Sequence, residues 1–281
     1  MTKVMALETP SGHEADRMST LPHERKSAPT LLPREKGAWG QVLFPLATGL
    51  HLGRASLASA GFAVAALAAF FAHEPLLLLL GGRGARARRE AITSAALMIA
   101  ACSLVGLSAL AFAASKLDQE EGWLALPVAL SLASLVVLAA GSERTTGGEI
   151  LAATAMSAWI VPMGASTGRI ELALQAWLAY VVAFGVATVA VGGAIDAHKH
   201  PGQSRLQAVS RAVVPAALLL TLGAWTAGAL PGAAVVGLCP IVVLAMVLAI
   251  RGVHPRHLRP VGWSMVVCMA FLALALAWAA G

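Results

Sequence analysis

Charged residues are scarce in this chain: 12% of its 281 residues are Asp, Glu, Lys or Arg, whereas 58% are hydrophobic. Soluble domains carry roughly twice that share of charge, about 25%, because their surfaces face water. The mean hydropathy of +0.76 agrees with this imbalance. The composition therefore excludes a soluble globular protein and predicts an integral membrane protein.

Cysteine is also rare, and the three cysteines show no CxxC spacing. All three (Cys102, Cys239 and Cys268) lie within apolar runs. An odd number of cysteines in such positions predicts packing residues, and neither a disulfide framework nor a thiolate metal site. The Walker, HExxH, GxGxxG and CxxCH patterns are absent as well, so no soluble catalytic centre of those kinds is indicated.

An excess of basic residues gives the chain a formal charge of +6. These residues fall in short clusters between apolar runs, which indicates membrane topology rather than nucleic-acid binding. No nucleic-acid partner is predicted.

Long apolar runs make up most of the sequence, and a bilayer about 30 Å thick requires roughly 20 apolar residues per helix. Nine candidate spans follow from this length: residues 37–53, 55–81, 91–115, 123–140, 150–165, 172–195, 212–230, 233–250 and 261–280. Several joins are only a few residues long, so sequential helices should be antiparallel neighbours. The predicted fold class is all-α, a polytopic transmembrane helical bundle in which residues 37–281 form a single domain.

The second run is too long for an upright helix. Its 27 residues, Ala55 to Gly81, would extend about 40 Å if helical throughout. Either this helix tilts strongly, or it ends near His73 and residues 76–80 form a separate interfacial piece. Pro75 favours the break.

The first 36 residues differ from the rest of the chain, since they are polar, mixed in charge and rich in Pro, Ser and Thr. This composition predicts a disordered tail without a signal peptide. If the tail is cytoplasmic, 17 of the Lys and Arg residues lie on that side of the nine spans and only three (Arg54, Lys116 and Arg169) lie on the other. The positive-inside rule then places the N-terminus in the cytoplasm and the C-terminus outside.

Polar residues gather at two of the cytoplasmic joins. The join between the second and third spans carries His73 and Glu74, followed by Arg83, Arg86, Arg88 and Arg89. An ionisable pair inside an apolar run is a functional-site hypothesis, because charge there is costly. The arginines could hold a phosphate or diphosphate. The alternative is that they fix topology and contact anionic lipid headgroups.

The join between the sixth and seventh spans carries Asp196, followed by His198 and His200. One carboxylate and two histidines are a weak metal signal, and no metal site is predicted. We interpret His73, Glu74 and Asp196 as candidate catalytic residues at the polar opening of a cytoplasm-facing cavity, with Glu74 as base or cation ligand. Arg83, Arg86, Arg88 and Arg89 are the candidate phosphate ligands, together with Arg34.

Three segments resemble the YwiC-like family of bacterial membrane proteins. They are PREKGAWGQVLFPLATG at 33–49, AHEPLLLLLGGRGARARRE at 72–90, and the helix that Glu149 opens after a charged turn. The resemblance covers roughly residues 33–280. Members usually have His where this chain has Lys36, and the family carries no established activity to transfer. The resemblance therefore implies a multi-pass architecture in a bacterial inner membrane, and it does not imply a reaction.

A looser similarity is to the UbiA superfamily of intramembrane prenyltransferases, which also has nine helices with functional loops after the second and sixth. The Asp-rich motifs that hold Mg²⁺ and prenyl diphosphate in that superfamily are missing here. Their absence argues against ordinary Mg²⁺-dependent prenyl transfer. The arginines still predict binding or transfer of a lipid or prenyl phosphate, and the cofactor is left open. The alternative from a different class is a transporter or a non-catalytic membrane scaffold.

Overall fold

The computed structural model describes residues 31–32, 36–117, 121–200 and 202–281. Within these residues all regular structure is helical. The predicted tail, residues 1–36, lies almost wholly outside the described part.

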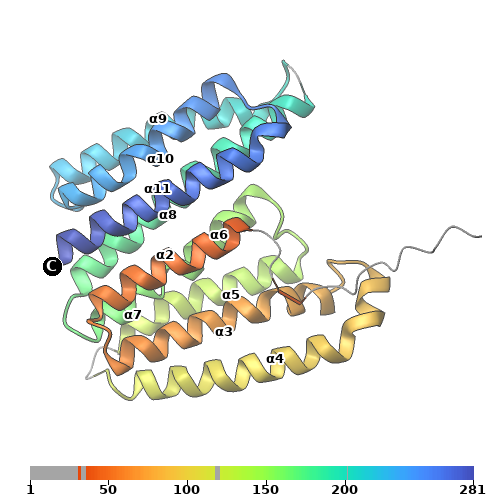
Figure 1. Ribbon diagram of the computed structural model, residues 1–281, viewed down its shortest axis with the longest axis vertical. Coiled ribbons are helices and arrows are strands. Elements are labelled where there is room, and N and C mark those ends of the chain that lie inside the picture. Colours follow the sequence, from red (N-terminus) through yellow and green to blue (C-terminus); the bar gives the residue numbers. More distant parts are fainter. Residues whose placement is uncertain (1–30, 33–35, 118–120, 201) are drawn as a thin grey trace, which may run out of the picture.

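The described helices run back and forth between the two ends of the bundle (Figure 1). The helices are α2 (Lys36–Leu52), α3 (Leu57–Leu79), α4 (Ala85–Ala114), α5 (Ala125–Ala139), α6 (Thr146–Ser157), α7 (Ile160–Ala165), α8 (Ile170–Lys199), α9 (Arg205–Thr226), α10 (Gly232–Arg251) and α11 (Leu258–Ala280). In the described residues, seven helices are long and apolar enough to cross a membrane. The 17-residue α2 is one further pass, and α6 with α7 forms the other, interrupted at Ala158 and Trp159. The predicted all-α multi-pass bundle is confirmed.

The predicted break before Pro75 is wrong, because α3 continues through it to Leu79. Proline removes a single helical N–H donor, and a neighbouring helix can stabilise the segment across that gap. Here α4 packs along α3, and the two form the most extensive helix pair of the bundle. The following turn reverses at Gly81 and Gly84, whose φ angles are +86° and +90°.

The start of α4 differs from the prediction as well. The helix begins at Ala85, six residues before the predicted span. Arg86, Arg88 and Arg89 therefore lie on its first two turns and not in a loop.

Two apolar cores hold the bundle together. One is formed mainly by α8, α9, α10 and α11, and the other by α2, α3 and α7 with the C-terminal end of α4. Between these groups, the buried hydroxyls of Thr48 on α2 and Tyr180 on α8 lie 2.9 Å apart and share a hydrogen bond. The two groups of helices are visible as upper and lower halves in Figure 1.

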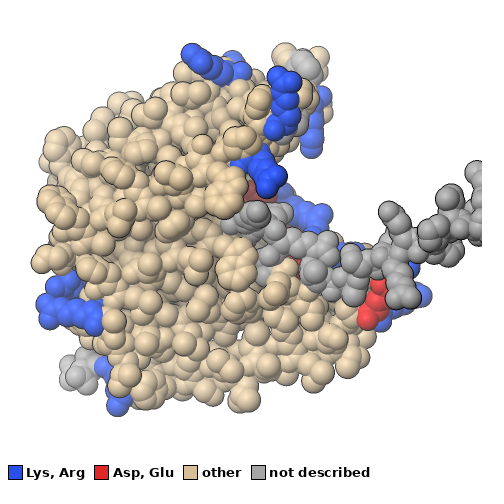
Figure 2. Space-filling view, viewed as in Figure 1, with Lys and Arg blue, Asp and Glu red and all other residues tan. Residues whose placement is uncertain are grey.

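Basic side chains are concentrated at one end of the bundle. Figure 2 shows most Lys and Arg atoms around a hollow on the right-hand side and few on the left. The right-hand end holds the α3–α4, α5–α6, α8–α9 and α10–α11 joins, while the C-terminus lies at the left-hand end. The arrangement has the charge asymmetry that positive-inside topology requires.

Candidate functional site

Glu74 lies in the last two turns of α3, where its carboxylate is held by Arg83 from the α3–α4 turn. The Nη2 atom of Arg83 donates to both carboxylate oxygens of Glu74, at 2.6 Å each, and Nε donates to Oε2 at 3.2 Å. The Glu74 side chain is 12% exposed and that of Arg83 is 38% exposed. The structure thus brings two of the predicted site residues together, and their charged groups form an ion pair with each other.

His73 precedes Glu74 and is partly buried. Three charged groups lie close enough to interact electrostatically with its imidazole: Glu74, Arg83 and Glu143. The first two were predicted from the sequence. Glu143 comes from the α5–α6 join and was missed, although it belongs to the charged turn already noted before Glu149.

The turn that carries Glu143 is tightly built. Thr145 caps the N-terminus of α6: its hydroxyl accepts a hydrogen bond from the Gly148 N–H at 3.1 Å and donates one to the Ser142 carbonyl at 2.7 Å. A Cβ atom on Gly148 would lie 2.9 Å from both the Cα and the carbonyl oxygen of Glu143. Only glycine therefore lets the Glu143 backbone pack against the first turn of α6.

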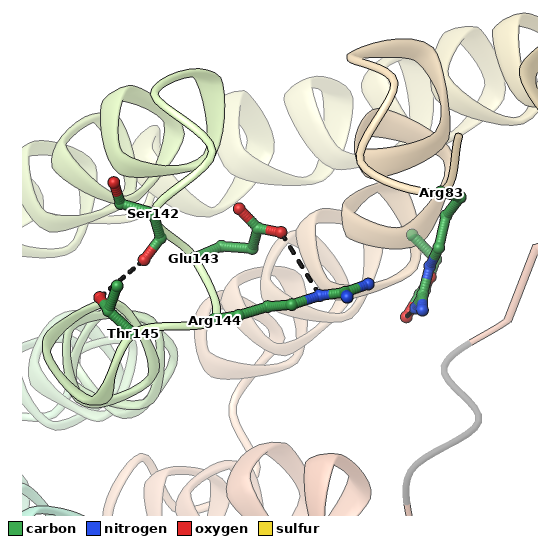
Figure 3. A network of polar contacts seen from close by, with 6 residues as sticks. Arg83, Ser142, Glu143, Arg144 and Thr145 are labelled. Carbon is green, nitrogen blue, oxygen red and sulfur yellow. Dashed lines mark hydrogen bonds and ion pairs between the residues drawn. The ribbon is translucent and has the colours of Figure 1, made fainter. Parts of the chain in front are cut away.

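This turn directs Glu143 and Arg144 toward the end of α3 and the α3–α4 turn (Figure 3). The Glu143 side chain is 16% exposed, and its Oε1 lies 3.7 Å from Nε of Arg144, beyond hydrogen-bonding distance. Its Oε2 is buried and has no hydrogen-bond partner in the described part of the chain. We refer to His73, Glu74, Arg83, Glu143 and Arg144 as the polar mouth.

The arginines on α4 fall into two groups. Arg86 is paired along the helix with Glu90, with Nε 2.8 Å from Oε1. Arg88 and Arg89 have no ion pair with a carboxylate among the described residues. Together with Gly81, Ala85 and Ile92 they line an open surface depression of about 580 Å³. We refer to it as the α4 depression.

The first turn of α4 leaves its backbone N–H groups available. Gly84 is the N-cap residue, and no side chain caps this end of the helix. Uncapped N–H groups and the helix dipole favour an anion at such a position. Gly81 lies at the edge of the α4 depression, while Gly82 packs beside Glu143, so the polar mouth and the depression share one turn.

Asp196 takes no part in either feature. It lies on the last turn of α8, where Oδ2 accepts hydrogen bonds from the Ser204 hydroxyl at 2.6 Å and from the Leu206 N–H at 3.3 Å. Oδ1 lies 3.0 Å from Nδ1 of His200. These contacts fasten the α8–α9 join. Arg34, the remaining predicted ligand, lies outside the described residues.

One motif escaped the sequence analysis. GASTG at residues 164–168 matches the GxSxG spacing of a hydrolase nucleophile turn, which places serine between a strand and a helix. Here Ser166 follows α7, and its hydroxyl donates to the Met163 carbonyl at 2.7 Å. The match lacks the strand that gives the motif its chemistry. Within the described chain there is also no group of three or more His, Cys, Asp or Glu residues that could hold a metal ion.

Comparison with known proteins identifies a family over one part of the chain. Residues 32–164 match the family model described as YwiC-like protein. No curated protein matches the chain, and no solved structure does. The matched region contains α2 to α6 and all of α7 except Ala165, and therefore the whole polar mouth and the α4 depression, whereas Asp196 lies beyond it.

Proposed function

We propose that the α4 depression, which lies in the part of this multi-pass chain that matches the YwiC-like family model, binds the phosphate of a membrane lipid or an isoprenoid. The observation that carries the proposal is the pair of guanidinium groups on Arg88 and Arg89, which line the depression and have no carboxylate partner among the described residues. Arginine binds phosphate oxygens through paired N–H donors and retains its charge under all ordinary conditions.

The environment of these arginines suits an anion with an apolar tail. The uncapped N-terminus of α4 adds N–H donors and positive dipole charge to the depression. Ile92, one turn further along α4, supplies an apolar wall. The depression thus combines donors for a phosphate with a surface for a hydrocarbon chain.

The length of α4 supports a position of the arginines at the depth of the lipid headgroups. The helix has 30 residues and extends about 45 Å, whereas the hydrocarbon core of a bilayer is about 30 Å thick. Its apolar part begins at Ala91, so the first two turns project beyond the hydrocarbon core. A phosphate bound there would remain at the level of lipid phosphates.

The geometry supports binding more than group transfer. Transfer by way of Glu74 would require a free carboxylate, and Arg83 occupies both of its oxygens. A transporter would place its charged site near the middle of the membrane, whereas the polar mouth and the α4 depression lie at one end of the bundle. We therefore propose a one-sided site that faces the cytoplasm.

Native mass spectrometry of the detergent-purified protein tests the proposal. The Arg88→Ala/Arg89→Ala variant should lose a co-purified phosphate-bearing lipid or isoprenoid. The matched control is Arg256→Ala/Arg259→Ala, which removes two exposed arginines from the same end of the bundle and should retain the ligand. Mass identifies the ligand as phospholipid or isoprenoid phosphate. Equal loss of lipid from both variants would show that the arginines act only through overall charge, and retention by both would show that Arg88 and Arg89 do not hold the lipid; either result would overturn the proposal.

The orientation of the site requires its own measurement. In inverted and right-side-out vesicles, an impermeant thiol reagent should label an Arg256→Cys variant from the cytoplasmic side and a Lys116→Cys variant from the other. The native cysteines are replaced beforehand. Labelling of the Arg256→Cys variant from the outer side and of the Lys116→Cys variant from the cytoplasmic side would mean that the site faces outward.

A further inference from the structure

An apolar groove follows one face of α10 at the edge of the bundle, where α9 and α10 lie side by side (Figure 1). It has a volume of about 480 Å³, and Leu218 of α9 contributes to its wall. The residues of α10 that line it are apolar from Cys239 to Ile250, and the groove ends at Arg251. We refer to it as the α10 groove.

The α10 groove opens to the surroundings of the bundle and not to its core. The other face of α10 belongs to the apolar core through Leu238, Ile241 and Ala245. In the groove, by contrast, Val243 is 56% exposed and Ile250 is 60% exposed. Because α10 is long and apolar enough to cross a membrane, these exposed side chains face lipid hydrocarbon.

The length of the α10 groove matches one leaflet of a bilayer. At 1.5 Å per residue, the stretch of helix from Cys239 to Arg251 is about 18 Å long. Half of a hydrocarbon core about 30 Å thick is roughly 15 Å. A membrane-spanning helix of another protein would require a groove across both leaflets, whereas an acyl chain requires only one.

Arg251 gives the groove a positive charge at the end of the bundle where the basic side chains gather. It is exposed and has no carboxylate partner in the described part of the chain. Arg211 of α9 donates from Nε to the Ala249 carbonyl at 3.1 Å and from Nη2 to the Ile250 carbonyl at 3.4 Å. These bonds compensate the negative end of the α10 dipole, which would otherwise repel an anion. The guanidinium of Arg251 is therefore available to a phosphate.

We propose that the α10 groove holds one acyl chain of an anionic phospholipid, with the lipid phosphate on Arg251. No acidic residue lines the groove, so nothing there would pair with the cationic headgroup of a zwitterionic lipid. The site lies beyond residues 32–164, which match the family model. It is separate from the α4 depression, and the inference does not depend on phosphate binding there.

Photo-crosslinking of the full-length protein in lipid vesicles tests the inference. Phosphatidylcholine vesicles contain a trace of phosphatidylglycerol with a diazirine on one acyl chain, and mass spectrometry of the digested protein locates the cross-links. The label should be several-fold enriched on the segment from Cys239 to Ile250 relative to the exposed residues of α11. The enrichment should disappear when the diazirine is carried by phosphatidylcholine with the same chains.

Two variants, each with a matched control, separate the charge from the groove. Arg251→Gln should lose the enrichment, whereas Arg259→Gln removes another exposed arginine from the same end of the bundle and should keep it. Val243→Trp fills the groove and should also lose the enrichment. Val267→Trp adds the same ring at a 66% exposed position on α11 and should keep it.

Even labelling of all exposed apolar helix faces would mean ordinary bilayer contact and would overturn the inference. An unlabelled groove in a protein that light scattering shows to be dimeric would mean that a second copy covers it, which would also overturn the inference. The Arg88→Ala/Arg89→Ala variant should keep the label on α10. Failure of the α4 depression and failure of the α10 groove are therefore distinguished by separate variants.

Discussion

A single guanidinium nitrogen of Arg83 lies 2.6 Å from each carboxylate oxygen of Glu74. The contact joins the last turns of α3 to the turn that leads into α4. It explains why an acid is tolerated within an apolar helix, since the charge is neutralised where it enters the bundle. In this structure the Glu74 carboxylate is paired and helps to hold the turn.

We expect Glu74→Gln to destabilise the protein by about 1 kcal/mol, since it leaves Arg83 without its partner; the partial exposure of Arg83 limits the loss. Arg83→Gln should have a similar effect, and the double variant should cost less than the sum of the two. Chemical denaturation in detergent measures the three values. Strict additivity would show that the ion pair contributes nothing to stability.

A second prediction concerns Gly148 and the position of Glu143. Gly148→Ala should destabilise the protein by about 1–3 kcal/mol, because the added Cβ collides with the Glu143 backbone and the turn must shift. The displaced Glu143 side chain should gain access to water. Gly147→Ala is the matched control, since a Cβ there meets no atom within 4 Å. Equal effects of the two substitutions would contradict the packing argument.

Asp196 provides a third prediction, in which a candidate catalytic residue acts as a structural one. Asp196→Ala should lower the melting temperature because the Ser204 hydroxyl and the Leu206 N–H lose their acceptor. Lipid-phosphate binding should be unaffected, since the residue lies outside the polar mouth and the α4 depression. Melting curves and native mass spectrometry on the same sample check both parts. If the Asp196→Ala variant were stable but lost the bound lipid, Asp196 would contribute to the binding site and the prediction would be wrong.

The sequence was sufficient to predict the architecture. Apolar runs of bilayer length are visible in the order of residues along the chain, so the passes and the clustering of basic residues at one end could be predicted without knowledge of packing. The continuity of α3 could not be predicted in this way. The local sequence shows that Pro75 removes a helical hydrogen bond, but it does not show that α4 packs along α3 and stabilises the helix there.

The candidate site was only partly predictable for the same reason. Glu74 and Arg83 were identified because they interrupt an apolar run, but their mutual pairing depends on how the turn closes. Glu143 lies in an ordinary polar turn, and sequence does not show that the fold brings this turn beside Gly82 of the α3–α4 turn. Asp196 was assigned to the site because its join faces the same end of the bundle, yet a shared end does not bring side chains into contact.

The hydrogen bond between Thr48 and Tyr180 gives a fourth prediction, about how the two groups of helices are joined. Both hydroxyls are buried, and the two residues are 132 positions apart in the chain. Tyr180→Phe should cost about 1 kcal/mol because it leaves the Thr48 hydroxyl unsatisfied in an apolar interior. Thr48→Val should have a comparable effect.

The double variant should be more stable than the sum of the single losses predicts, since it removes the donor and the acceptor together and leaves no orphaned polar group. Denaturation of the four proteins of this cycle yields the coupling energy. A coupling near zero would mean that the threonine hydroxyl finds another acceptor on α2, and that apolar packing alone joins the family-matched helices to α8.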